Sequence, residues 1–257
     1  LLHAEAAYIH ELRSQMRQEE RGTGSWRTPH YASGKGNLYP THGLGPVAQY
    51  MSLARKEDNF KSIVSYSTPA MGRKLYAEKY FSADHKWNEL DFSNGDLNTS
   101  IIKTELGRTI MVQWDETSPR PYSRLNLVQG TRGTLAGFPT RVALEGGVLG
   151  ITDDHHRWVD GADLDKVYEK YDHPLYKRLN EKSKSSGHGG MDGIMMFRIV
   201  ECLRLGLPLD QNVYEGAFWS AVTELSGKSI EIDGAPQTFP DFTRGNWKTT
   251  EPLDIIA

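Results

Sequence analysis

The sequence lacks the cysteines that would let it crosslink itself. Cys202 is the only cysteine among 257 residues, so no intrachain disulfide can form. A lone cysteine fits a reducing compartment, and it fits a large exported bacterial domain equally well. The chain opens at Leu1 without a methionine, already inside what reads as a strand. We therefore expect an upstream portion that would hold any export signal to the periplasm, and the compartment stays open.

An excess of positive charge is lacking as well. Lys and Arg number 30 against 33 Asp and Glu, giving a formal net charge of -3, and no basic stripe is interleaved with aromatic residues. Because nucleic-acid binding needs such a stripe, we expect no nucleic-acid partner. The apolar runs are short, so we expect no membrane span. With 38% hydrophobic residues the chain can still bury a large core, which indicates a globular protein.

The first half of the chain predicts a meander of strands. Closely spaced strands imply antiparallel pairing, because parallel neighbours need a long crossover. Turn signals such as Leu106-Gly107-Arg108 separate the strands. Six segments rich in β-branched and aromatic residues are predicted strands: 1–12, 60–67, 98–106, 108–115, 122–129 and 140–145.

Apolar residues at helical spacing predict helices over 43–54, over 191–204 and from Tyr214 to Leu225. We interpret each apolar stripe as facing the core. The fold class is therefore α+β, with an open, mostly antiparallel sheet whose helices pack on one face and whose other face is free to carry a site. Residues 68–97 and 150–188 read as long loops, which are typical of functional or partner-facing segments.

The string Gly43-Leu44-Gly45-Pro46-Val47-Ala48 fits the G-x-G-x-x-G/A fingerprint of dinucleotide-binding folds. That fingerprint follows a buried strand, whereas Tyr39-Pro40-Thr41-His42 precedes the string here, and proline is a poor residue for a central strand. We interpret the glycines as the start of a closely packed helix. Any cofactor phosphate loop is then expected upstream.

Two further motifs have an ordinary interpretation beside a functional one. The loop 186–192 opens the helix over 191–204, where free backbone N–H groups could hold an anion. Alternatively its glycines bring the loop close to a ligand or to the sheet, with His188 in the site or hydrogen-bonded beside it. Asp153-Asp154-His155-His156 gathers four potential metal ligands, but adjacent residues seldom converge on one ion. We expect a solvated turn there and no metal.

A distributed set of polar and aromatic residues remains: Tyr8, Trp26, Arg27, Tyr39, His42, Tyr122 and Arg124. The strings around them resemble glycoside hydrolase family 109, and they follow that family's order along nearly the whole chain. That family is the α-N-acetylgalactosaminidase branch of the glucose-fructose oxidoreductase and inositol dehydrogenase superfamily. The strings are Ala6-Ala7-Tyr8-Ile9-His10-Glu11-Leu12-Arg13, Trp26-Arg27, Tyr39-Pro40-Thr41-His42-Gly43-Leu44-Gly45-Pro46, Ser118-Pro119-Arg120-Pro121-Tyr122-Ser123-Arg124, Val128-Gln129-Gly130-Thr131 and Gly187-His188-Gly189-Gly190-Met191-Asp192.

The resemblance implies that residues 1–257 are the substrate-binding C-terminal domain of a longer enzyme. An N-terminal Rossmann domain that holds NAD is expected upstream of residue 1, and without it the fragment is expected to be inactive. The implied reaction is retaining hydrolysis of terminal α-N-acetylgalactosaminides by oxidation at C3, proton removal at C2, elimination, water addition and reduction. Such a route explains why no pair of acidic residues stands out, although ordinary glycosidases need two carboxylates.

By similarity, the sugar site has eight candidate residues, and Tyr39 also reaches the cofactor. His42 and Tyr39 suit proton transfer, because an imidazole titrates near neutrality and a phenol does so with help from positive charge. The N-terminus of the helix that follows would favour their deprotonated forms. We favour His42 over Tyr8 as the base at C2. The candidates are Tyr8, Arg27, Tyr39, Pro40, Thr41, His42, Tyr122 and His188.

Two alternatives stay open. A NAD(P)-dependent sugar or polyol dehydrogenase of the same superfamily commonly has an aspartate and a histidine in a G-x-x-x-D-x-x-x-H-like stretch. Asn37-Leu38-Tyr39-Pro40-Thr41-His42 has no aspartate, which favours the glycosidase. A non-catalytic carbohydrate-binding module would bind sugar without NAD. In each case the free face of the sheet is a candidate surface for a homo-oligomer.

Overall fold

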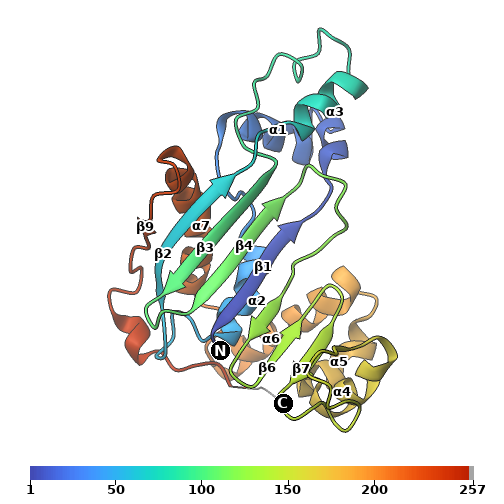
Figure 1. Ribbon diagram of the computed structural model, residues 1–257, viewed down its shortest axis with the longest axis vertical. Helices are drawn as coiled ribbons and strands as arrows, with labels where there is room; N and C mark the ends of the chain where they lie inside the picture. The colour runs from blue at the N-terminus through green and yellow to red at the C-terminus, as the bar shows by residue number, and fades with distance from the viewer. Residues whose placement is uncertain (255–257) are drawn as a thin grey trace.

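The structure is a computed structural model, and it describes residues 1–254. One sheet of nine strands forms its centre, in the order β8-β7-β6-β5-β1-β4-β3-β2-β9 (Figure 1). The strands are β1 (His3–Ile9), β2 (Phe60–Ser67), β3 (Leu97–Thr104), β4 (Thr109–Asp115), β5 (Leu127–Gln129), β6 (Gly133–Ala136), β7 (Arg141–Leu144), β8 (Val159–Asp160) and β9 (Gln237–Thr238).

Every pair of neighbouring strands is antiparallel except β1 and β4. The predicted open, mostly antiparallel sheet is confirmed. The parallel pair was not predicted, and its register sets Ile9 opposite Asp115. Both strands consequently end at the same edge of the sheet, where the chain segments that follow them lie close together (Figure 1).

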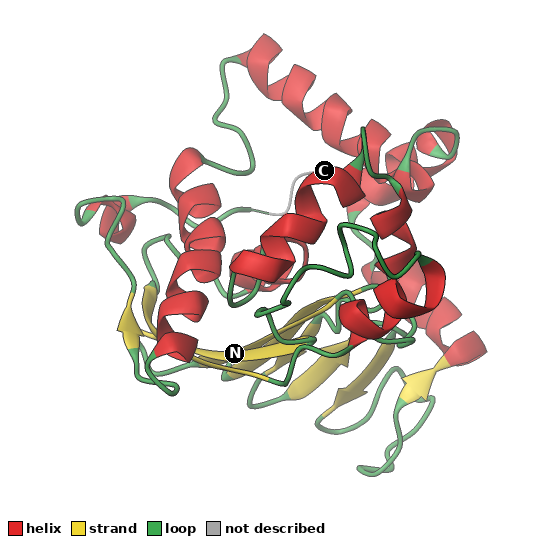
Figure 2. Cartoon of the chain, turned by 90° about the horizontal axis from the view of Figure 1, so that it is seen from above, coloured by secondary structure: helices red, strands yellow, loops and turns green. Residues whose placement is uncertain are grey.

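The helices gather on one side of the sheet, as predicted (Figure 2). Among residues 1–254, no helix combines the length and apolar composition that crossing a membrane requires. The α-helices are α1 (Thr23–Ser33), α2 (Thr41–Tyr50), α3 (Gly72–Tyr80), α4 (Leu164–Tyr171), α5 (Pro174–Ser183), α6 (Met191–Leu205) and α7 (Val213–Glu231).

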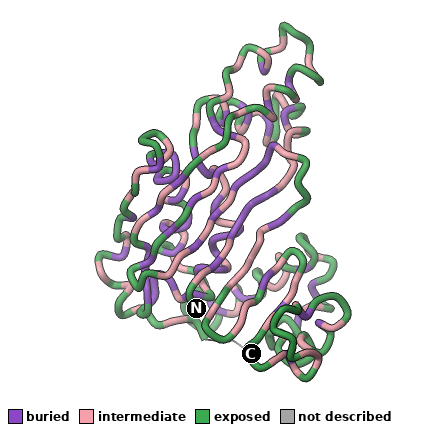
Figure 3. Tube along the Cα trace, viewed as in Figure 1, coloured by how far each residue is buried: buried purple, intermediate pink, exposed green. Residues whose placement is uncertain are grey.

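The main core lies between the sheet and the helices α2 and α7. Side chains alternate between the two faces of a strand, so Ala4 and Ala6 of β1 point toward α2 and are fully buried. Leu44 and Val47 supply the apolar stripe of α2, and Phe218 does so for α7. Buried residues follow the central strands in Figure 3. The strand–helix pair β1 and α2 is therefore held firmly, which matters for the site below.

Several predicted segments need correction. Residues 68–97 and 150–188 are not long loops, because α3 lies in the first, and β8, α4 and α5 lie in the second. The predicted strand over 122–129 shrinks to β5, and β6 occupies a segment for which no strand was predicted. The helices α3, α4 and α5 span only 8 to 10 residues and are mostly polar, so a prediction based on long apolar stripes did not identify them.

The helix α6 begins where predicted, but its stripe is not all core. Met191 and Met195 are 50% and 54% exposed, whereas Arg198 and Cys202 are buried. Tyr214 of α7 is likewise exposed, while Phe218 is fully buried. The periodicity identified helices correctly, but it gave no information on which partner covers each face.

Candidate functional site

The end of β1 and the start of α2 bring Tyr8 and His42 side by side. Gly43 lies directly on β1, since a Cβ at this position would come within 2.4 Å of the Ala7 amide nitrogen. Only glycine allows so close an approach, which confirms the interpretation of this string as helix packing rather than a phosphate loop. With the first turn of α2 fixed on β1, the His42 and Tyr8 ring centroids are 5.1 Å apart.

Five rings from three stretches of the chain form one group, which we call the ring cluster: Tyr8, His10, Tyr39, His42 and Tyr122. Tyr39 is 4.4 Å from Tyr8 and 4.6 Å from His42 between ring centroids. Tyr122, from the segment after β4, is 6.2 Å from Tyr8. Their edge-to-face and tilted contacts are the favourable geometry for aromatic pairs. The cluster therefore offers hydroxyl and imidazole groups together with ring faces in one place.

A buried charge network lies behind the ring cluster. Glu116 directly follows β4, is 1% exposed, and lies 3.6 Å from Arg27 Nη1 and 3.6 Å from Arg73 Nη2. The Tyr31 hydroxyl donates a hydrogen bond to the same carboxylate. The Arg27 guanidinium in turn lies over the Tyr39 ring, 5.1 Å from its centroid. Glu116 therefore holds the cation that borders the cluster.

The environment sets which groups of the cluster carry protons. Burial, and next the negative charge of Glu116, raise the pKa of Tyr8 to about 12. Burial, and next the positive charge of Arg124, lower the pKa of His42. Around neutral pH the Tyr8 phenol is therefore protonated and the His42 imidazole is neutral. The site combines a hydroxyl donor with a base that is free to accept a proton.

The structure brings seven of the eight sequence-predicted residues together. Pro40 is buried as the N-cap of α2, and Thr41 begins that helix beside His42. The seven are Tyr8, Arg27, Tyr39, Pro40, Thr41, His42 and Tyr122, which gather around the end of β1 and the start of α2.

The eighth residue, His188, comes from the turn before α6, and its side chain contacts Asp192 rather than a member of the ring cluster. Its side chain is 70% exposed and its Nδ1 is 3.0 Å from Asp192 Oδ1. It nevertheless contributes to the lowered pKa of His42. The alternative in which His188 is hydrogen-bonded beside the site describes its contacts, and its part in sugar binding stays a prediction.

The candidate site lies on the helix-covered face of the sheet. The layer argument had left the opposite, free face to carry a site. Tyr8 shares the helix-covered face with Ala4 and Ala6, because residues two apart on a strand point the same way. The residues 153–156 form an exposed turn. Proton-handling groups therefore gather under the helices, at the edge of the sheet.

Sequence reasoning missed two residues of the site, His10 and Glu116. A histidine two positions after Tyr8 had a usable signal, since both side chains leave the same face of the strand. Glu116 had none. Only the parallel β1–β4 pairing carries it beneath Arg27, and that pairing was not predicted.

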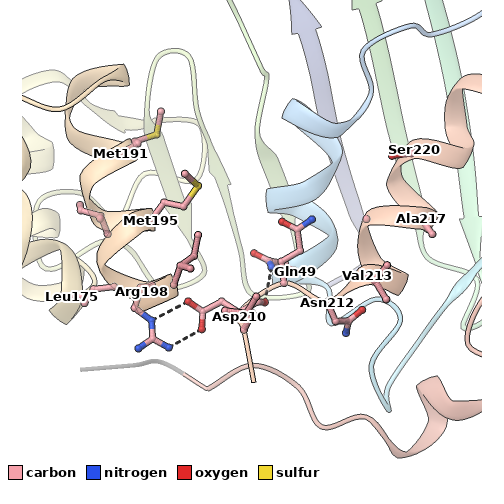
Figure 4. A pocket seen from close by; sticks show the side chains of 15 residues that line it. Gln49, Leu175, Met191, Met195, Arg198, Asp210, Asn212, Val213, Ala217 and Ser220 are labelled. Atoms are coloured by element: carbon pink, nitrogen blue, oxygen red, sulfur yellow. Dashed lines mark hydrogen bonds and ion pairs between the residues drawn. The ribbon is translucent and has the colours of Figure 1, made fainter. Parts of the chain in front are cut away.

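A separate hollow of about 940 Å³ lies between α6 and α7 (Figure 4). Met191 and Met195 line one wall, which accounts for their exposure, and Ala217 lines the other. An ion pair at one end joins Arg198 Nη2 to Asp210 Oδ1 at 2.8 Å. The hollow contains none of the residues of the ring cluster.

Comparison of the chain with known proteins identifies its family. The family model described as glycosyl hydrolase 109, C-terminal domain, matches residues 1–249. The chain belongs to glycosyl hydrolase family 109. It is 67% identical over 258 residues to glycosyl hydrolase family 109 protein 1 of Akkermansia muciniphila, with 100% of this chain and 53% of that protein covered. The corresponding values are 56%, 100% and 55% for a family 109 protein of Shewanella baltica.

This family 109 chain thus spans about half the length of the curated relatives it matches. Among solved structures it is similar to levoglucosan dehydrogenase in complex with NADH, with a TM-score of 0.59 and 12% identity over 94% of this chain and 59% of that chain. A NAD binding oxidoreductase from Klebsiella pneumoniae gives a TM-score of 0.58 at 14% identity, over 92% of this chain and 58% of that chain. At such identities the likeness shows a shared fold.

Proposed function

We propose that the ring cluster binds the terminal sugar of a glycoside, and that the full-length protein hydrolyses α-N-acetylgalactosaminides with NAD as a recycled cofactor. One observation carries the proposal: neutral His42 lies against the Tyr8 and Tyr39 phenols beside the Arg27 cation. Membership of family 109 supports it. Phenols and a guanidinium supply hydrogen bonds to sugar hydroxyls and an acetamide, and ring faces pack on the C–H surfaces of the sugar.

The state of Glu116 argues against ordinary acid and base glycosidase chemistry. That chemistry needs two carboxyl groups that flank the scissile bond. Glu116 is the carboxylate packed behind the ring cluster, and it is buried and engaged by Arg27, Arg73 and Tyr31. A carboxylate so occupied is poorly placed to protonate a leaving group. A route that works through neutral imidazole and phenols suits the residues better.

The residues of the ring cluster fit the nicotinamide end of NAD. They do not fit its phosphates. The glycines of 43–48 are packed on β1 and Trp219 and leave no phosphate loop there. When bound, NAD supplies hydride acceptance from C3 of the sugar and hydride return. The half-buried Tyr39 ring, between Arg27 and His42, is the group of this chain that we assign to the cofactor side.

The chain's own residues would then move the protons. We assign removal of the C2 proton to His42, because its neutral imidazole can accept one. The Tyr8 phenol lies beside His42, and its oxygen accepts a hydrogen bond from a sugar hydroxyl. Arg27 holds the ring of Tyr39 and fixes the orientation of the substrate.

A sugar or polyol dehydrogenase is the second candidate, and the fold shared with levoglucosan dehydrogenase favours it. The test is to give the full-length protein p-nitrophenyl α-N-acetylgalactosaminide with a catalytic amount of NAD+. Nitrophenol release without net NADH supports the glycosidase, whereas NADH formed in proportion to the substrate consumed supports the dehydrogenase. Sugar binding that needs no NAD and gives neither product supports a binding module and overturns both.

We further propose that the full-length protein has an upstream NAD-binding Rossmann domain, that it is an exported bacterial enzyme, and that this chain alone is inactive. The relatives, nearly twice as long, support the domain.

We also propose pairing of two copies through the uncovered face of the sheet. Val64, Ile101 and Met111 form a cross-strand apolar row there, with Ile101 39% exposed. Sedimentation of wild type against Ile101→Lys tests it: loss of a dimer supports the pairing, and a wild-type monomer overturns it.

A further inference from the structure

His10 faces Tyr8 in a geometry that suits proton exchange. It follows β1 by one residue, and its Nδ1 is 3.2 Å from the Tyr8 hydroxyl oxygen. The two rings meet edge to face with centroids 5.8 Å apart. On its other side the His10 ring packs against Tyr122 at 5.0 Å. The contact is therefore built by the strand and fixed by a second ring.

The backbone holds His10 in place as well. Its N–H donates to the Asp115 carbonyl at 2.8 Å, which continues the β1–β4 pairing past the end of the strand. The side chain is half-buried, so solvent reaches the imidazole without competing freely for the Tyr8 hydroxyl. His10 is thus both anchored and accessible, which a group that passes protons to and from a buried phenol requires.

One direction of this hydrogen bond places the Tyr8 proton between the phenol oxygen and His10 Nδ1. A protonated phenol has one hydrogen to donate, and burial together with the negative charge of Glu116 keeps Tyr8 protonated. Tyr8 donates this hydrogen to His10 in the tautomer whose Nδ1 is bare and whose ring proton is on Nε2. The contact is consequently a ready path from the Tyr8 oxygen to an imidazole base.

We propose that His10 is the proton partner of Tyr8 in the sugar site, and the inference rests on the proposed function. As a proton of the bound sugar moves to the Tyr8 oxygen, the phenolic O–H bond breaks and an Nδ1–H bond forms on His10. The sugar is left with the negative charge and the imidazolium with the positive charge. The reverse transfer restores both groups, so no proton is gained or lost. His10 acts through Tyr8 and so makes that phenol usable as a base.

The first test needs only this chain and no sugar. In a ¹⁵N-labelled sample, long-range ¹H–¹⁵N spectra at pH 8 report which imidazole nitrogen carries the proton. We expect Nδ1 of His10 to be bare, and Tyr8→Phe to shift the His10 nitrogen signals. His3 is the matched control, since it lies on the same strand with its Nδ1 2.8 Å from Thr109 Oγ1, and its signals should not move. A protonated Nδ1 on His10, or no response to Tyr8→Phe, overturns the proposal.

The second test uses turnover of p-nitrophenyl α-N-acetylgalactosaminide by the full-length protein. His10→Asn places an amide oxygen near the position of Nδ1, so it keeps an acceptor for Tyr8 but cannot take its proton. We expect kcat to fall by about 100-fold or more with KM changed only a few-fold, since a positioned proton-transfer group contributes about 10²–10⁴ in rate. His3→Asn should retain the wild-type kcat.

The two levels of inference fail in different ways. A His10→Asn protein with wild-type kcat shows that the contact only positions Tyr8, and it overturns the proton exchange. A loss of activity that appears only as a higher KM, with kcat unchanged, has the same meaning. A wild-type protein that neither binds nor cleaves the glycoside overturns the proposed function instead. The nitrogen spectra then decide by themselves whether Tyr8 donates its proton to His10.

Discussion

Gly43 lies so close to Ala7 that a Cβ on residue 43 would come within 2.4 Å of the Ala7 amide nitrogen and 2.5 Å of its carbonyl oxygen. This contact fixes the first turn of α2 on β1 and thereby sets the separation of His42 from Tyr8. Backbone atoms cannot give way as a flexible side chain can, so a larger residue has to push the helix outward.

Gly43→Ala is therefore expected to lower the free energy of unfolding by about 1–3 kcal/mol, as overpacking does. Urea unfolding followed by circular dichroism measures it. Gly216→Ala is the matched control, because a Cβ there meets only the Gln211 amide nitrogen at 3.5 Å within α7. The control should be stabilised by up to about 1 kcal/mol, from the better helix propensity of alanine. Equal effects of the two changes would contradict the close-packing account.

His42 makes a second prediction through pH. Its pKa is lower in the folded chain than the usual 6.5, so below about pH 6.5 the unfolded chain binds the proton first. Stability contributed by neutral His42 is complete above that pH and is lost as pH falls toward the folded-state pKa. His42→Gln should lose less stability between pH 7 and pH 5 than wild type does. His156→Gln, in the exposed turn, is the control, and an identical slope in all three proteins would refute the expectation.

Tyr8 predicts an effect at the alkaline end. Its pKa is raised to about 12, against about 10 for an ordinary phenol, so the unfolded chain releases this proton first. The folded chain should therefore lose stability as pH rises from 10 to 12, and Tyr8→Phe should lose less. Absorbance at 295 nm, taken as the difference between wild type and Tyr8→Phe, gives the ionisation directly. A difference centred near pH 10 would show that burial and Glu116 do not act on this phenol.

Glu116→Gln tests the network behind the cluster. The substitution leaves the Arg27 and Arg73 cations without their buried carboxylate. Breaking a buried ion pair on one side costs about 3–5 kcal/mol, and we expect a loss of that size in urea unfolding. The matched control is Glu224→Gln, whose partner Lys228 lies on the surface of α7, and it should be nearly neutral. A neutral result for Glu116→Gln would mean that the carboxylate does not hold Arg27.

Local sequence patterns predicted those elements whose local preference agrees with their packing. The glycines at 43 and 45 and the apolar spacing after them predicted a helix over 43–54, which the structure has as α2 at Thr41–Tyr50, and helical spacing found α6 and α7. The proximity of Tyr8, His42 and Tyr122 came from the family resemblance, since no local pattern links residues so far apart. The ring distances agree with that expectation.

Long-range pairing was the part that sequence could not supply. The sequences of β1 and β4 do not indicate that the two strands pair in parallel. Both are short apolar segments in what the sequence predicts to be an antiparallel meander. Glu116 could not be assigned for the same reason. The exposed Met191 and Met195 have the periodicity of a core helix, and what distinguishes them is the hollow they border. Periodicity reports that a face is apolar and leaves open what covers it.

The central claim is that a sugar binds in the ring cluster, and a crystal structure of the full-length protein with NAD and N-acetylgalactosamine tests it most directly. We expect the sugar within hydrogen-bond distance of His42, Tyr8 and Arg27, with the Tyr39 ring between sugar and cofactor. A sugar bound instead in the hollow between α6 and α7, with the ring cluster closed around its own side chains, would contradict the account.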